Sequence, residues 1–332
     1  MEIENPEQPK VILIGGVGRT GTNIVKDVLC DHPAVFGLPF ESRITVDPDG
    51  LAPTLALLQS CWSPFVAEKA IGRLERFLKR VARKSLSDKA ASLIENLFPW
   101  YSKLGNLKTY KEWELVEYFP GYEEASRRLI AELSAETYKA AWPGGNSLNN
   151  HTMRVTPYCD GAGTKEAAKR FLSTIHANIL HRNKAKFYVD DNTYNVLFAN
   201  LLFEIIPNSH LIHMIRDPRE VALSYREQRW MPQDIGQCAE LVNESFCRWE
   251  DVKCQLDASW YTEVRLEQLC SDPVGIIENI IARCGLDSDA NLDYSQIKAP
   301  RSRWKRNPLP ESDRVILNDN LAKTVQRYGY AL

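Results

Sequence analysis

The sequence lacks an excess of charge of either sign. Its 332 residues hold 41 lysines and arginines against 43 aspartates and glutamates, so the formal net charge is −2. A protein whose main partner is nucleic acid carries a basic field over a face or a helix, and this composition argues against such a partner. Any anion-binding site in this chain therefore has to be built locally.

Long hydrophobic runs and paired cysteines are also missing. No window reaches the ~18 consecutive apolar residues that a membrane-spanning helix requires, and the polar, acidic first ten residues are unlike a signal peptide. The eight cysteines are scattered, without a C-x-x-C pair or a Cys/His cluster at zinc-finger spacing. These absences predict a cytoplasmic protein with reduced thiols, no metal site and no membrane partner.

Hydrophobic residues make up 44% of the chain and charged residues 25%, which is ordinary for a globular protein. Short apolar runs predict strands at 11–15, 186–190, 211–215 and 261–266. Helical spacing follows each of them, at 20–30, 195–206, 218–229 and 273–284. This alternation predicts an α/β fold with an open, mostly parallel sheet flanked by helices.

The alternation stops between 51 and 180, which predicts a helical insertion within one domain over 1–332. Residues 66–98 have helical spacing, with one apolar and one basic stripe. The basic stripe includes Arg73, Arg76 and Arg80. Such a stripe normally faces solvent, and the alternative is a basic wall for an anionic acceptor. Aromatic residues gather over 100–158, and we expect the insertion to form an acceptor pocket.

The first predicted strand runs into a glycine-rich loop and then into a helix. The loop reads Gly15-Gly16-Val17-Gly18-Arg19-Thr20-Gly21-Thr22-Asn23. Its backbone N–H groups and the positive end of the helix favour phosphate or sulfate. The spacing G-x-G-x-x-G also fits a dinucleotide fingerprint, with Glu41 as the ribose-binding acid, and this keeps an NAD(P)-binding oxidoreductase open. Thr22 and Asn23 replace the Lys-Ser/Thr pair of a Walker A loop, which argues against an ATPase or a kinase.

A second motif follows the strand at 211–215. Asp217 and Pro218 are typical of the N-cap and first position of a helix, and Glu220 is placed as the capping-box partner. Arg216 offers a planar fork of hydrogen-bond donors to a phosphate at the end of the strand. Ser224, two helical turns later, can add a hydroxyl from the same face. A well-capped helix start without a ligand is the alternative interpretation.

Together the two motifs resemble those of sulfotransferases that use 3′-phosphoadenosine 5′-phosphosulfate (PAPS). Gly18-Arg19-Thr20-Gly21-Thr22-Asn23 is similar to the family's phosphosulfate loop, and Arg216 with Ser224 is similar to its 3′-phosphate motif. Residues 263–273 and 301–305 resemble two later segments, the second of which covers PAPS. The resemblance implies a P-loop-like fold and in-line transfer of a sulfuryl group from PAPS, leaving adenosine 3′,5′-bisphosphate.

The resemblance also implies roles for individual residues. It implies contacts to PAPS from Gly18, Arg19, Thr20, Gly21, Thr22, Asn23, Arg216, Ser224 and Arg301. The segment from His32-Pro33 to Glu41-Ser42-Arg43 is similar to one in tyrosylprotein sulfotransferases. This implies Glu41 as the general base and Arg19 as the cation at the leaving phosphate. A salt bridge in a surface loop is the alternative role for Glu41, and His151 is the best of the alternative bases.

The sequence departs from the family pattern at three places. Asp191-Asn192-Thr193-Tyr194 stands where many members have a lysine, and Leu266 replaces a tyrosine. Asn23 stands in the loop where a second threonine or a bulkier residue is common. These departures keep a non-catalytic nucleotide-binding relative as an alternative. The expected partner is a small-molecule, glycan or phenolic acceptor with a hydroxyl or an amine. The sequence decides neither among these acceptors nor the oligomeric state.

Overall fold

The structure is a computed structural model that describes residues 8–84, 97, 114–134, 136–140, 151–155, 162–288, 290–298, 302–304 and 309–331. Its contacts divide the chain into two compact units. The first, here called the sheet unit, comprises Lys10–Gly37, Ala185–Phe203 and Asn208–Leu332. The second, here called the insertion unit, comprises Met1–Pro9, Leu38–Lys184 and Glu204–Pro207.

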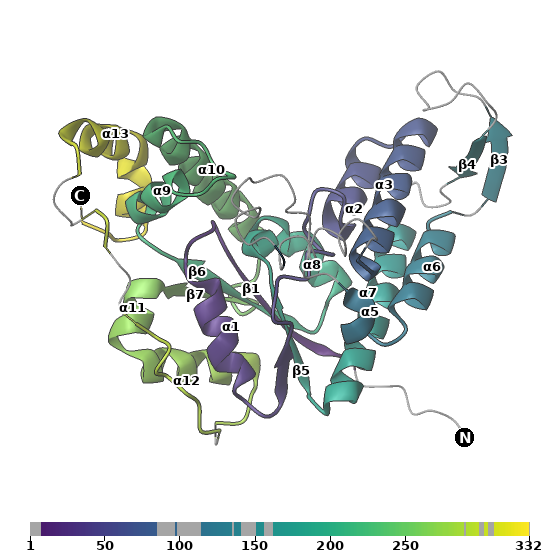
Figure 1. Ribbon diagram of the computed structural model, residues 1–332, viewed down its shortest axis with the longest axis horizontal. Helices are drawn as coiled ribbons and strands as arrows, with labels where there is room; N and C mark the ends of the chain where they lie inside the picture. The colour runs from purple at the N-terminus through teal and green to yellow at the C-terminus, as the bar shows by residue number, and fades with distance from the viewer. Residues whose placement is uncertain are drawn as a thin grey trace. The chain divides into compact units, whose positions relative to one another are not determined.

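The sheet unit is built on one five-stranded sheet (Figure 1). Its strands are β1 (Lys10–Gly16), β2 (Val35–Gly37), β5 (Phe187–Asp191), β6 (Ser209–Ile215) and β7 (Tyr261–Arg265). They lie in the order β2-β5-β1-β6-β7, and each neighbouring pair is parallel. The predicted α/β fold with a mostly parallel sheet is confirmed.

Helices flank this sheet. They are α1 (Thr22–Cys30), α8 (Ala199–Ile205), α9 (Pro218–Arg226), α10 (Ile235–Lys253), α11 (Leu266–Ser271), α12 (Pro273–Cys284) and α13 (Glu311–Arg327). A 3-10 turn, η2 (Thr193–Phe198), precedes α8, so the predicted helix at 195–206 is two elements. On one face, Val25 and Val28 of α1 and Ile277 and Ile280 of α12 share a buried core with Ile14. This burial fixes the ends of the central strands against α1.

The register of β1 against β6 decides where the two sequence motifs meet. Gly16, the last residue of β1, lies opposite Met214, one residue before β6 ends. Adjacent parallel strands end at the same edge of a sheet, so the glycine loop and Arg216 leave the sheet side by side. This edge is the usual place for ligands in open α/β sheets.

The insertion unit is mainly helical. Its elements are α2 (Leu51–Ser60), α3 (Pro64–Ala82), α5 (Leu115–Tyr118), α6 (Tyr122–Glu132), α7 (Ala162–Asn183) and the antiparallel strands β3 (Glu136–Ala140) and β4 (His151–Val155). The strand pair was not predicted from the sequence. Among the described residues, no helix is long and apolar enough to cross a membrane.

Helix α3 confirms the amphipathic pattern predicted for the start of 66–98. Ile71, Leu74, Leu78 and Val81 are buried. The basic stripe (Arg73, Arg76 and Arg80) is exposed. The helix ends at Ala82 because the backbone turns to an extended conformation at Arg83, so the prediction is wrong at 83–84. The rest of the predicted helix lies almost wholly outside the described residues.

Candidate functional site

The loop after β1 has a backbone that few sequences adopt. Gly18 and Gly21 have φ angles of 90° and 91°, in the left-handed region that glycine enters without penalty. Arg19 between them has φ 57°, which costs a residue with a Cβ about 1–2 kcal/mol. Strain of this kind is found mainly at binding and catalytic sites. The loop therefore has the geometry expected of a ligand clamp.

Two side chains hold this loop against the sheet unit. The hydroxyl of Tyr225 donates to the carbonyl of Val17, and a Cβ on Gly18 would lie 2.7 Å from that hydroxyl. Burial raises the pKa of Tyr225 well above its usual value of 10.0, so the phenol stays a hydrogen-bond donor. A Cβ on Gly21 would lie 2.8 Å from a methyl group of Leu266. Glycine is thus required at both positions by space as well as by φ.

Helix α1 begins directly after the loop. Its N-cap is Gly21, which supplies no side-chain acceptor for the first N–H groups of the helix. These groups and the helix dipole leave a positive end at the loop. The Thr20 hydroxyl is buried and has no hydrogen-bond partner among the described residues. A buried polar atom without a partner is costly, and a bound anion or hydroxyl would satisfy it.

The second motif begins helix α9 as the sequence predicts. Asp217 is the N-cap, and its carboxylate accepts a hydrogen bond of 3.0 Å from the N–H of Arg219. The same carboxylate also binds the Arg219 guanidinium, at 2.7 Å and 3.0 Å. Arg216, just before the cap, is 7% exposed, and Ser224 on the inner face of α9 is 1% exposed. Burial lowers the pKa of Arg216 from its usual 12.5, and an arginine remains charged at neutral pH even so.

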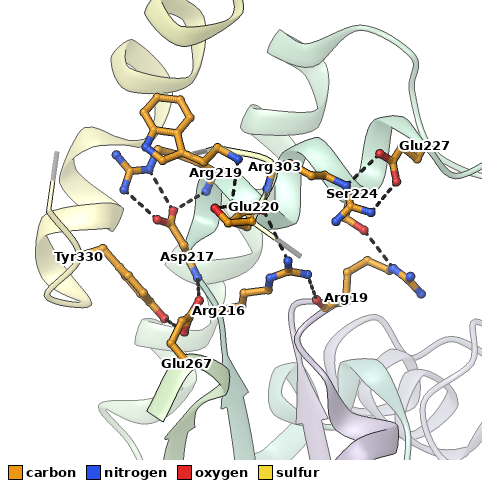
Figure 2. Close-up of polar contacts among 12 residues, drawn as sticks. Arg19, Arg216, Asp217, Arg219, Glu220, Ser224, Glu227, Glu267, Arg303 and Tyr330 are labelled. Carbon is orange, nitrogen blue, oxygen red and sulfur yellow. Dashed lines mark hydrogen bonds and ion pairs between the residues drawn. The ribbon is translucent and has the colours of Figure 1, made fainter. Parts of the chain in front are cut away.

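The structure brings the two motifs into direct contact (Figure 2). The Nε of Arg19 donates to the Ser224 hydroxyl at 3.2 Å, although the residues are 205 positions apart. The Nη1 of Arg216 donates to the Arg19 carbonyl at 3.2 Å. Arg19 itself is exposed at the loop, so its guanidinium is open to a ligand. Hydrogen bonds thus link Arg19, Arg216 and Ser224 at the ends of β1 and β6.

The capping-box role predicted for Glu220 is wrong. Its carboxylate turns away from the start of α9 and accepts hydrogen bonds from Ser302 and from the backbone N–H groups of Arg303 and Trp304. It also pairs with Arg216 at 3.5 Å. Asp217 alone caps the helix because its side chain reaches the second helical N–H. No local sequence pattern signals this contact, since the partners are more than 80 residues apart.

The remaining predicted PAPS contacts are Thr20, Thr22, Asn23 and Arg301. Thr20 and Thr22 are buried, and Asn23 is exposed on the first turn of α1. Arg301 lies outside the described residues. Arg303 is described, and its guanidinium binds Glu227 at 2.6 Å and 2.8 Å. Arg303 also lies close enough to Arg216 to lower the pKa of that arginine, so a third cation belongs to this cluster.

Glu41 lies in the insertion unit, within a small ion-pair network. Its carboxylate accepts from Arg43 at 2.9 Å, and Arg43 also reaches Asp47 at 3.5 Å. Burial raises the pKa of Asp47, and the Arg43 charge opposes that rise. Arg43 has φ 59°, so this loop, like that of Arg19, contains a left-handed residue other than glycine. The Glu41 side chain is 23% exposed.

Four of the described histidines, His32, His176, His210 and His213, are buried, whereas His181 near the end of α7 is exposed. His32 is buried; its Nδ1 accepts from the Ala34 N–H, and its Nε2 donates to the Asp287 carbonyl. His210 pairs with Thr262 at 2.8 Å, and His213 is buried beside Glu263. The side chain of His151 lies outside the described residues, so its candidacy stays a prediction.

The strand order bears on the alternative of a dinucleotide-binding enzyme. In the classical dinucleotide fold the strand after the first helix lies next to the first strand. Here that strand, β2, is separated from β1 by β5. The glycine spacing therefore occurs in a sheet with a different order, and the oxidoreductase alternative is not favoured.

Comparison with known proteins gives two results. A model of the sulfotransferase family matches residues 109–290, which include Arg216 and Ser224. The comparison with curated proteins found no match.

Several solved structures are similar in fold. The sulfotransferase domain of the olefin synthase of Synechococcus PCC 7002 has 16% identity and a TM-score of 0.47, over 100% of this chain and 98% of that one. The sulfotransferase STF1 of Mycobacterium tuberculosis H37Rv has 13% identity and a TM-score of 0.46, over 96% and 77%. A sulfotransferase of Alicyclobacillus acidocaldarius has 13% identity and a TM-score of 0.44, over 98% of both chains. Such low similarity has no bearing on substrate or mechanism.

The family model matches more than half of the chain. The matched range includes Arg216 and Ser224, which both form hydrogen bonds with Arg19 of the glycine loop. This chain belongs to the sulfotransferase family.

Proposed function

We propose that the chain transfers a sulfuryl group from PAPS to a hydroxyl or an amine of an acceptor. The observation that carries this proposal is the contact between Arg19 and Ser224, together with the bond from Arg216 to the Arg19 carbonyl. Two arginines and a hydroxyl converge on the positive end of α1. This arrangement suits a ligand with two separate anionic groups, and adenosine 3′,5′-bisphosphate has two.

The residues present fit such a ligand. The unpartnered Thr20 hydroxyl and the uncapped N–H groups of α1 can bind oxygen atoms of one anionic group. The Arg216 fork and Ser224 can bind the other. When bound, PAPS supplies the activated sulfuryl group. In this proposal Arg19 stabilises the charge that develops on the departing phosphate, and such preorganised cations are a major source of rate enhancement.

Glu41 is proposed as the general base. Its carboxylate would accept the proton of the attacking hydroxyl, and Arg43 holds that carboxylate in one orientation at 2.9 Å. A fixed carboxylate needs little reorganisation in the transition state. The insertion unit is proposed to supply the acceptor pocket, as part of a single sulfotransferase domain.

The choice of nucleotide is tested by a panel of ligands in thermal unfolding. We expect adenosine 3′,5′-bisphosphate to raise the Tm, because a ligand that binds only the folded state stabilises it. NAD, NADP and ATP at the same concentration should have little effect. Stabilisation by NAD or NADP without any effect of the bisphosphate would replace the sulfotransferase proposal with the oxidoreductase.

The base is tested by Glu41→Gln, with Glu123→Gln as the matched control. Glu123 is an exposed carboxylate of the same unit that pairs with Arg83. Loss of a general base costs 10²–10⁴-fold in rate, so we expect kcat to fall by about that factor and bisphosphate affinity to stay near the parental value. A loss of both would indicate a structural role for Glu41, and a loss of neither would shift the assignment to His151.

A further inference from the structure

Glu220 is a buried carboxylate with an unusual set of partners. It is 5% exposed. One oxygen accepts from the Ser302 hydroxyl at 2.6 Å and from the Trp304 N–H at 2.9 Å. The other accepts from the Arg303 N–H at 2.8 Å and pairs with Arg216 at 3.5 Å. A single side chain of α9 therefore contacts both a cation of the candidate site and a distant segment of the chain.

The geometry points to Glu220 as a positioning residue that orients the Arg216 guanidinium and fastens residues 302–304 to helix α9. As far as it concerns PAPS binding, this inference rests on the proposed function. Its first consequence is that nucleotide affinity depends on Glu220, although its carboxylate would repel the phosphates if it touched them. Its second consequence is that the backbone at 302–304 is released when the carboxylate is lost.

The reason lies in the acceptor capacity of a carboxylate. Two oxygens offer about four lone-pair positions, and the four contacts of Glu220 fill them. A buried charge is tolerated only when it is paired and hydrogen-bonded. An amide in its place would keep one acceptor oxygen and turn a donor either toward the Arg303 N–H and Arg216 or toward the Ser302 hydroxyl and the Trp304 N–H. Several of these contacts would be lost at once.

The other contacts of the segment are weaker anchors. The Arg303 side chain binds Glu227, whose side chain is 54% exposed, and such exposed pairs contribute little. The Trp304 ring lies 4.4 Å from the Arg219 guanidinium and 5.2 Å from that of Arg314. None of these contacts binds a backbone N–H of 302–304. Glu220 binds two of them, so the main chain of this segment is held by Glu220 (Figure 2).

The position of Arg303 connects the two consequences. Its backbone N–H donates a hydrogen bond to Glu220, and its positive charge lowers the pKa of Arg216. Releasing the segment would therefore move one cation of the cluster while also removing the counter-charge of another. We expect nucleotide affinity to fall without any change in the chemistry of the reaction.

The test compares the parent, Glu220→Gln and the control Glu244→Gln. Glu244 pairs with Arg248 on α10, and its side chain is 61% exposed, so the control makes the same chemical change at the surface. Bisphosphate affinity is measured by calorimetry, steady-state kinetics gives KM for PAPS and kcat, and limited trypsin digestion reports cleavage after Arg303. We expect about a tenfold or greater loss of affinity, an equal rise in KM, unchanged kcat at saturating PAPS, and faster cleavage after Arg303.

A purely structural role would lower kcat and raise the KM for the acceptor, in addition to weakening nucleotide binding, and that result would overturn the inference. Parental affinity and a parental cleavage rate in Glu220→Gln would overturn it too. If Glu220→Gln fails to fold, Ser302→Ala removes one of the four contacts and should shift affinity and cleavage in the same direction by a smaller factor. If the parent does not bind the bisphosphate, the proposed function fails, and the cleavage rate alone decides whether Glu220 fastens the segment.

Discussion

Replacing Arg216 gives the most direct test of the candidate site. The guanidinium is nearly buried and fixed by contacts with the Arg19 carbonyl and with Glu220. A hydrogen bond to a charged group contributes about 1.5–3 kcal/mol, so Arg216→Ala should weaken bisphosphate binding about 10- to 150-fold. Arg216→Lys keeps the charge and loses the planar fork, and it should recover only part of the affinity. Ser224→Ala removes a neutral group and should cost about 0.5–1.5 kcal/mol.

The assay is calorimetric titration with adenosine 3′,5′-bisphosphate, alongside urea unfolding of each variant. The unfolding curves are needed because Arg216→Ala removes a counter-charge from buried Glu220, which destabilises the fold by itself. Arg248→Ala is the control, since Arg248 is 67% exposed on α10. Parental affinity in a folded Arg216→Ala protein would show that the fork does not bind the nucleotide.

Three further outcomes are expected. Gly21→Ala should lower stability by at least about 1–2 kcal/mol in urea unfolding, because alanine is strained at φ 91° and its Cβ would lie 2.8 Å from a methyl group of Leu266. Alanine at all three positions of the basic stripe should leave bisphosphate affinity intact, and a salt-sensitive rise in acceptor KM would indicate an anionic acceptor. Burial lowers the pKa of His176 from 6.5 to about 3, so the unfolded state binds more protons between these pH values and stability falls as pH drops through them. Between pH 6.5 and 5 the parent should lose about 2 kcal/mol more than His176→Gln, and equal losses would contradict the buried neutral histidine.

The parallel sheet could be predicted because its strands are short apolar runs. Residues 11–15 and, apart from His213, residues 211–215 lack polar side chains, which is what a strand covered by helices on both faces requires. The contact between the two motifs depends in addition on the strand order, which places β1 beside β6 so that both motifs leave the sheet at the same edge. From the sequence alone, only the resemblance to the sulfotransferase motifs groups Arg19 with Arg216, because hydrophobic pattern and local spacing do not predict the strand order.

The strand pair β3–β4 and the contacts of Glu220 could not be predicted, for two different reasons. Every residue of β3 from Glu136 to Lys139 is exposed, so no apolar face marks the strand in the sequence. Glu220 occupies the third position of helix α9, where a local pattern predicts that its carboxylate binds the N-cap backbone N–H in a capping box. Its actual partners come from a segment 82 to 84 residues later, and no local pattern records such a contact.

Positive and negative side chains balance in the cluster of Figure 2, and this balance affects how the site attracts and orients an anionic ligand. The four arginines drawn there stand against four carboxylates, each of which contacts an arginine or the backbone beside one. A cluster so balanced attracts a distant anion weakly, because opposite charges cancel beyond a few ångströms. It does fix the direction of each guanidinium before a ligand arrives. Selectivity for a nucleotide at this site would then come from the placement of hydrogen-bond donors, and a chain with a net charge of −2 can bind a polyanion without a basic surface.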